Sequence, residues 1–124
     1  YSEKDVWEVL KRHKVNPHPC YRIGWNRCSC AMCIFSTPSL FAGIREIYPE
    51  EYASLRQDEK ILGFTLDNKK CLDDFVGDAG SCVYWEDKAA VRSIQTGVFS
   101  VGDIYVKEWK YPAGAFHGAE GGPC

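Results

Sequence analysis

The sequence lacks several features that would place it in a common class of protein. It has no long apolar run, and its mean hydropathy of -0.32 argues against a membrane-spanning segment. Its formal net charge of -2 excludes a strongly basic nucleic-acid-binding protein. No basic segment followed by an apolar one opens the chain, so secretion is not indicated and we expect a cytoplasmic, reducing setting.

The common catalytic signatures are also missing. The chain contains no G-x-x-x-x-G-K-[ST], G-x-G-x-x-G, H-E-x-x-H or G-x-S-x-G motif, so no complete catalytic constellation is visible. Methionine occurs once, at Met32, and Tyr1 stands at what reads as the start of a helix. We therefore expect that an N-terminal portion of a longer protein precedes this segment.

What is present indicates a folded, mainly α protein. A hydrophobic content of 45% and an aromatic content of 14% support a core, and 124 residues suit a single domain over 1–124. Apolar spacing, N-cap residues and glycines after the last turn predict helices over residues 3–13, 38–48, 49–62, 71–76 and 85–96. We expect a small helical domain with a cysteine-rich loop and a short β-hairpin near the C-terminus.

Prolines and alternating side chains predict the non-helical parts. Pro17 and Pro19 disfavour a helix, so residues 15–25 are expected to run extended into the cysteine-rich loop. Residues 102–109, GDIYVKEW, alternate loosely enough to predict a strand of the hairpin.

Four of the seven cysteines fall in the segment CYRIGWNRCSCAMC, residues 20–33. The Cys30-x-x-Cys33 spacing lets two thiolates face one centre, as at zinc, iron–sulfur and dithiol redox sites. Cys20 and Cys28 could complete a local set of four metal ligands, although this spacing matches no standard zinc finger. Two alternatives stay open, namely dithiol redox chemistry and inert buried thiols.

The cysteine-rich end is also the cationic end. Residues 1–37 carry six Lys or Arg against three acids, so this part has a net charge of +3. Arg22, Arg27 and His18 flank the cysteines and are candidates to bind a phosphate or sulfate, while His18 and His13 are also possible metal ligands or general acids. Cys124, after a glycine-rich tail, is a candidate catalytic thiol or fourth metal ligand.

The first 35 residues resemble the C-terminal part of the phosphoadenosine phosphosulfate (PAPS) reductase family, within the PP-loop, adenine-nucleotide α-hydrolase-like superfamily. In that family a helix leads to a P-x-HP-Y-x-x-G stretch and then to C-x-x-C. The matching residues are Trp7, His18, Pro19, Tyr21, Gly24, Cys30 and Cys33, with Cys20 as an extra residue between Pro19 and Tyr21. The phosphate-gripping PP-loop and the Cys-Cys doublet that complete the family's nucleotide and [4Fe-4S] sites are absent from this chain.

The resemblance implies a C-terminal domain appended to an upstream PP-loop nucleotide-binding domain, and inactive alone. The implied reaction is thiol-dependent reduction of an adenylyl sulfate to sulfite, with a thioredoxin-like reductant. Cys30 and Cys33 would belong to an iron–sulfur or zinc site, and Arg22 and Arg27 to an anion site. The alternative is a structural zinc-binding module that contacts nucleic acid or a protein partner, as in nucleic-acid sulfur modification.

Overall fold

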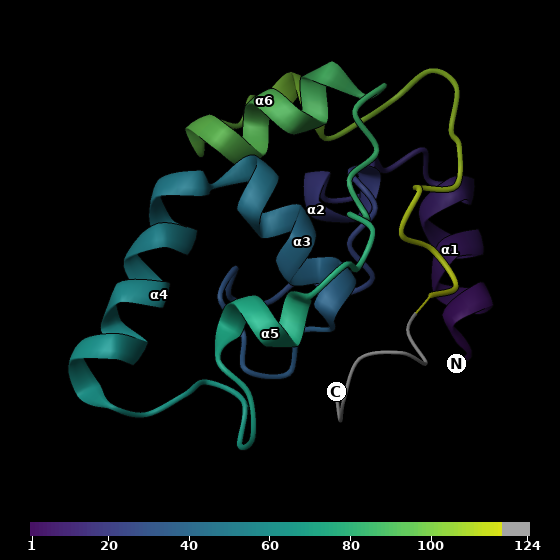
Figure 1. Ribbon diagram of the computed structural model, residues 1–124. Helices are drawn as coiled ribbons and strands as arrows, with labels where there is room; N and C mark the ends of the chain where they lie inside the picture. Colours follow the sequence, from purple (N-terminus) through teal and green to yellow (C-terminus); the bar gives the residue numbers. More distant parts are fainter. Residues whose placement is uncertain (118–124) are drawn as a thin grey trace. The chain divides into compact units, whose positions relative to one another are not determined.

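The computed structural model describes residues 1–117 and shows a mainly helical protein (Figure 1). Over these residues the elements are α1 (Glu3–Arg12), α2 (Pro19–Arg22), α3 (Pro38–Ile47), α4 (Pro49–Leu62), α5 (Leu72–Val76), α6 (Lys88–Thr96) and a 3₁₀ helix, η1 (Val101–Asp103). The predicted mainly α class is confirmed. Among the same residues, none of the helices combines the length and apolar composition needed to cross a bilayer.

The described residues form two compact units. The first unit comprises residues 1–28 and 83–117, and the second unit comprises residues 29–82. The division falls inside the cysteine-rich segment, with Cys20 and Cys28 in the first unit and Cys30 and Cys33 in the second. The single domain expected over 1–124 stays a prediction.

The second unit contains α3, α4 and α5, and the sequence predicts a helix at each of these places. The Thr37 hydroxyl accepts the Leu40 N–H at 3.3 Å, and Pro38 fills the first helical position of α3. α3 packs on both α4 and α5, and Phe41 meets Phe75 edge to face at 6.1 Å. α4 ends at Gly63, whose φ of +69° is the left-handed conformation that glycine adopts most easily.

One carboxylate fixes the long connection that follows α4. Glu59 accepts the backbone N–H groups of Leu66 and Leu72, each at 2.8 Å. Leu66 lies within the connection and Leu72 is the first residue of α5, so Glu59 ties both to the end of α4.

The first unit contains α1, α2 and α6. Ser2 and Asp5 form the predicted capping box at the start of α1, and Trp7 is the buried residue of that helix. The Trp7 ring packs edge to face on Tyr21 of α2 at 5.3 Å. α2 in turn packs on α6.

An ion pair joins α2 to α6. The Arg22 guanidinium donates from Nε and Nη2 to the two carboxylate oxygens of Asp87, both at 2.9 Å. Asp87 also accepts the Ala90 N–H at 3.0 Å and so caps α6. The predicted helix over 85–96 therefore begins three residues later, at Lys88.

The extended path predicted for residues 15–25 is wrong over its second half. Pro19 begins α2 instead of preventing it, since the first helical position needs no N–H donor and suits the fixed φ of proline. His18 precedes it as the N-cap, and its Nδ1 accepts the Cys20 N–H at 3.2 Å.

The hairpin predicted near the C-terminus is also not found within residues 1–117. Residues 101–103 form η1, and Tyr105 makes one isolated antiparallel bridge with Val15. Ser100 and Asp103 form a capping box that favours the tight turn over an extended strand.

Residues 109–117, here called the clasp, form no helix or strand and run along the rest of the first unit. Five hydrogen bonds link them to the rest of the first unit. Trp109 Nε1 donates to Val15 O at 2.8 Å, Gly114 N to Tyr21 O at 2.8 Å, and Phe116 N to Glu3 Oε1 at 2.7 Å. Asn26 Nδ2 donates to His117 O at 2.6 Å, and the Tyr111 hydroxyl donates to the Glu8 carboxylate. Gly114 lies so close to Trp25 that a Cβ at this position would be 1.9 Å from the Trp25 carbonyl oxygen.

Candidate metal centre

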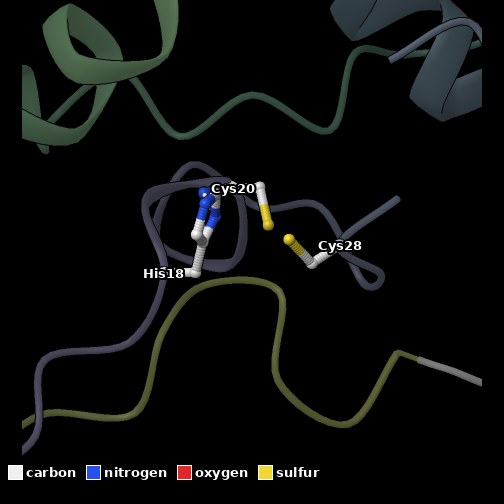
Figure 2. Close-up of side chains that lie close together, drawn as sticks. All are labelled: His18, Cys20 and Cys28. Carbon is white, nitrogen blue, oxygen red and sulfur yellow. Dashed lines mark hydrogen bonds between the residues drawn. The ribbon is translucent and has the colours of Figure 1, made fainter. Parts of the chain in front are cut away.

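Three potential metal ligands gather in the first unit: His18, Cys20 and Cys28. A nitrogen of His18 and the two Sγ atoms all lie within 4.8 Å of one another. Figure 2 shows the two sulfur atoms pointing toward one another, with the His18 ring beside Cys20. No other such group of three His, Cys, Asp or Glu side chains occurs in residues 1–117.

Local sequence places the first two ligands. Pro19 starts α2, so His18 stands at the N-cap and Cys20 at the second helical position. The Cys20 side chain turns inward and is only 3% exposed, whereas His18 and Cys28 are exposed. One wall of the group is therefore buried and the other faces solvent.

The third ligand is positioned by Tyr21. A backbone hydrogen bond links Cys28 to the Tyr21 hydroxyl, and Trp7 packs on the ring of the same tyrosine. Burial raises the pKa of Tyr21, so its hydroxyl stays neutral and able to take part in this bond. The helices α1 and α2 thus support the segment that carries Cys28.

The hydrogen bond to His18 sets its tautomer. Because Nδ1 accepts the Cys20 N–H, a neutral His18 carries its proton on Nε2. Partial burial lowers the pKa of His18, which favours the neutral form that binds metals. A metal on Nδ1 competes with the Cys20 N–H, and a metal on Nε2 requires the proton to leave that nitrogen.

The two thiols form a hydrogen-bonded pair. Burial raises the pKa of Cys20 well above its ordinary value, and the neighbouring Cys28 raises it further through charge and through the hydrogen bond. A metal cation reverses this balance, because coordination deprotonates a thiol outright.

The donor set supplies three of the four ligands of a tetrahedral zinc site and leaves the fourth position to water or another donor. With Zn–S bonds of about 2.3 Å and Zn–N bonds of about 2.0 Å, tetrahedral ligand atoms lie about 3.5–3.8 Å apart. The observed separations of up to 4.8 Å therefore need a contraction of roughly 1 Å, which side-chain rotation can provide. An iron–sulfur cluster commonly takes four thiolates, and here an imidazole stands with two.

Cys30 and Cys33 lie in the second unit. Cys30 is exposed and Cys33 is 7% exposed. Within the described part of that unit, no third His, Cys, Asp or Glu joins them in a metal-sized group. Their predicted role as metal ligands stays a prediction.

The two candidate anion-binding arginines differ in their surroundings. Arg22 is engaged by the Asp87 carboxylate through two nitrogens. Arg27 is half-buried, and its Nη1 has no hydrogen-bond partner within the described residues. Of the two, Arg27 is therefore the arginine with an unused hydrogen-bond donor. Cys124, the predicted catalytic thiol, lies outside the described residues.

Sequence reasoning missed the supporting residues Tyr21 and Asp87. Tyr21 appeared only as part of a family pattern, and nothing in the sequence pairs Asp87 with Arg22 across 65 positions. The His18-x-Cys20 spacing carried the usable signal for the metal group, because proline at 19 places both side chains at one helix start.

Comparisons with known proteins give one partial similarity. No protein-family model matches this chain, and no solved structure matches it. A protein of Escherichia phage 186, described as "Uncharacterized 37.8 kDa protein in gpa 5'region", is 34% identical over 62 residues. The similarity covers 50% of this chain and 19% of that protein, so the matched segment spans about a fifth of the relative's length.

Proposed function

We propose that the first unit is a zinc-binding module in which His18, Cys20 and Cys28 hold the ion. The observation that carries the proposal is the convergence of one nitrogen and two sulfurs within 4.8 Å. Mixed nitrogen and sulfur donors in tetrahedral geometry suit zinc. Zinc–thiolate sites need reduced cysteines, which the cytoplasm maintains, so we place the module there.

The ion's role in this proposal is structural. It would join the start of α2 to Cys28, which lies outside any helix. Much of the first unit has no regular secondary structure, so a metal crosslink adds stability that its short helices supply only in part. The module would then present a fixed surface to the rest of a larger protein or to a partner.

Zinc content tests the proposal. Protein purified with zinc and dialysed against zinc-free buffer is expected to retain about one zinc per chain. His18→Asn keeps an N-cap acceptor but removes the imidazole, so it should fold and lose zinc, as should Cys20→Ser and Cys28→Ser. Cys71→Ser, in the second unit, is the matched control and should retain zinc. Equal zinc retention by the ligand variants and the control would refute the proposal.

A second candidate is support of adenylyl sulfate reduction within a PAPS reductase-like protein. Two observations favour it: residues of the family pattern pack together as Trp7 on Tyr21, and Arg27 has a buried donor without a partner. In this reading an upstream PP-loop domain binds the nucleotide, a thioredoxin-like reductant supplies electrons, and Arg27 contacts the sulfonate or a phosphate.

Nucleotide binding tests the second candidate. Equilibrium binding of adenosine 5′-phosphosulfate should weaken by about tenfold in Arg27→Gln, which corresponds to about 1.4 kcal/mol. Arg92→Gln on the exposed face of α6 is the charge-matched control and should bind like the unmodified chain. Because this candidate places the nucleotide site in the upstream domain, binding is measured on a protein that contains both parts, and identical binding by the two variants would contradict a role for Arg27.

A further inference from the structure

The two cysteines of the metal group form a pair that could bond to each other. Their Sγ atoms lie within 4.8 Å, point toward one another in Figure 2, and share a hydrogen bond. Both are free thiols in this structure. A disulfide requires sulfurs about 2.05 Å apart, so the atoms need to approach by less than about 3 Å.

The two thiols differ in accessibility and in the rigidity of their backbone. Cys20 is 3% exposed and lies within α2. Cys28 is exposed, and residues 25–29 belong to no helix or strand. A dissolved oxidant therefore reaches Cys28 first, and Cys28 can shift toward Cys20 without breaking helical hydrogen bonds, because it lies outside any helix.

We propose that Cys20 and Cys28 are a reversible oxidation site, converted to a disulfide by a peroxide and restored by a dithiol reductant. In the first step the Cys28 sulfur attacks hydrogen peroxide: an S–O bond forms, the O–O bond breaks, and the thiol proton leaves with the second oxygen as water. In the second step the Cys20 sulfur attacks the Cys28 sulfur. The S–S bond forms, the S–O bond breaks, and the hydroxyl leaves with the Cys20 proton as water.

The electron balance closes over the two steps. Two thiols lose two electrons, and one peroxide takes them up to give two waters. In the reverse direction a dithiol reductant attacks the Cys20–Cys28 disulfide, forms a disulfide between its own two sulfurs, and leaves both cysteines as thiols.

Zinc and the disulfide exclude one another, because each uses the same sulfur lone pairs. Oxidation of the pair would therefore release the ion, and bound zinc would slow oxidation. This coupling rests on the zinc site proposed above, whereas formation of the disulfide in zinc-free protein does not.

Peptide mapping of the whole chain tests the disulfide. Zinc-free protein is treated with one equivalent of hydrogen peroxide, its remaining thiols are alkylated, and trypsin is added, which cuts after Arg22 and Arg27. The expected product joins the peptide ending at Arg22 to the peptide starting at Cys28, and the intact mass falls by two hydrogen atoms. A dithiol reductant added before alkylation should abolish this product.

Variants assign the bond, because the second peptide also carries Cys30 and Cys33. The double variant Cys30→Ser/Cys33→Ser should form the linked peptide in full, and Cys28→Ser should not form it. The double variant alone is decisive if Cys28→Ser fails to fold. Loss of the linked peptide in the double variant, or alkylation of Cys20 after oxidation of Cys28, would overturn the inference.

The zinc arm separates this inference from the proposed function. With free zinc at about ten times its dissociation constant, the linked peptide should form about tenfold more slowly. A linked peptide in a chain that binds no zinc would sustain the inference and refute the zinc module. Zinc binding without a linked peptide would support the zinc module and refute the oxidation site.

Discussion

The two units reach order by different routes. In the second unit, α3 starts at the Thr37 cap and buries apolar residues at helical spacing, and α4 and α5 each end at a glycine, so the bounds of these helices follow from local signals. In the first unit, hydrogen bonds between distant residues hold short helices together, as from Trp109 to Val15 and from Phe116 to Glu3. The proposed zinc ligands belong to the unit whose order depends on long-range contacts.

A crosslink adds little to helices that already bury an apolar face, and more to a unit whose parts meet only through the tertiary fold. We therefore expect the two units to respond differently to substitutions in the clasp and to removal of zinc.

The largest expected effect comes from Gly114→Ala. The new Cβ would lie 1.9 Å from the Trp25 carbonyl oxygen, so the clasp must separate from residues 24–25. We expect the free energy of unfolding of the first unit to fall by more than about 3 kcal/mol in urea titration.

Gly80→Ala is the matched control, because a Cβ there meets nothing within 4 Å. Its stability should stay within about 0.5 kcal/mol of the unmodified protein. If Gly114→Ala were as stable as the control, the clasp would not have the close packing described here.

Removal of zinc is expected to rank next. If free zinc stands at about 100 times its dissociation constant, chelation lowers the stability of the first unit by about 2.7 kcal/mol. Amide hydrogen exchange measures the loss of stability separately in each unit. Protection in α1 and α6 should fall by about 100-fold, while protection in α3 and α4 should stay unchanged. An equal loss of protection in α3 would contradict the division of roles.

Breaking the Arg22–Asp87 pair should have an intermediate effect. Arg22→Ala leaves a half-buried carboxylate without its fork partner, so we expect a loss of about 2 kcal/mol in urea titration. Asp87→Asn keeps an N-cap side chain for α6 and should lose less. A double variant whose loss equals the sum of the two single losses would show that the pair contributes nothing.

The corresponding change in the second unit is Glu59→Gln. A neutral amide offers one oxygen where the carboxylate accepts two backbone N–H groups, so we expect a loss of about 1 kcal/mol. Asp58→Asn, one residue earlier and exposed, is the control and should be near neutral. Hydrogen exchange at the Leu66 and Leu72 amides measures the change. Unchanged exchange there would show that Glu59 does not hold the connection after α4.

The smallest effect concerns pH and the start of α1. Hydrogen bonds from the Ser2 N–H and hydroxyl hold the pKa of Asp5 below its ordinary 3.8. The folded-state pKa is depressed, so this stabilisation is present above 3.8 and disappears as pH falls through the folded-state value. NMR titration should show the Asp5 pKa rising toward 3.8 in Ser2→Ala, and an unchanged value would contradict the capping box.

Much of the second unit was predictable from sequence because its signals are local. Thr37 and Pro38 mark the start of α3, and Gly63 marks the end of α4. Each signal lies directly at the helix end that it defines. Ser2 and Asp5 predict the start of α1 in the same way, because they form a capping box there.

The site was less predictable because its parts meet through the tertiary fold. The sequence predicts Cys20, Cys28, Cys30 and Cys33 as metal ligands, with His18 as a further possible one, and the structure gathers His18, Cys20 and Cys28. Proline disfavours a helix interior, but at position 19 it occupies the first helical position of α2 and places His18 and Cys20 at one helix end. The bridge from Tyr105 to Val15, separated by 90 positions, gives no local signal.

X-ray absorption at the zinc edge tests the ligand assignment most directly. In protein loaded with one zinc per chain, we expect two sulfur neighbours at about 2.3 Å and a nitrogen from imidazole at about 2.0 Å. His18→Asn prepared in the same way should retain no zinc and therefore show no absorption edge from a bound ion. A shell of four sulfurs, or a shell with none, would contradict the assignment of His18, Cys20 and Cys28.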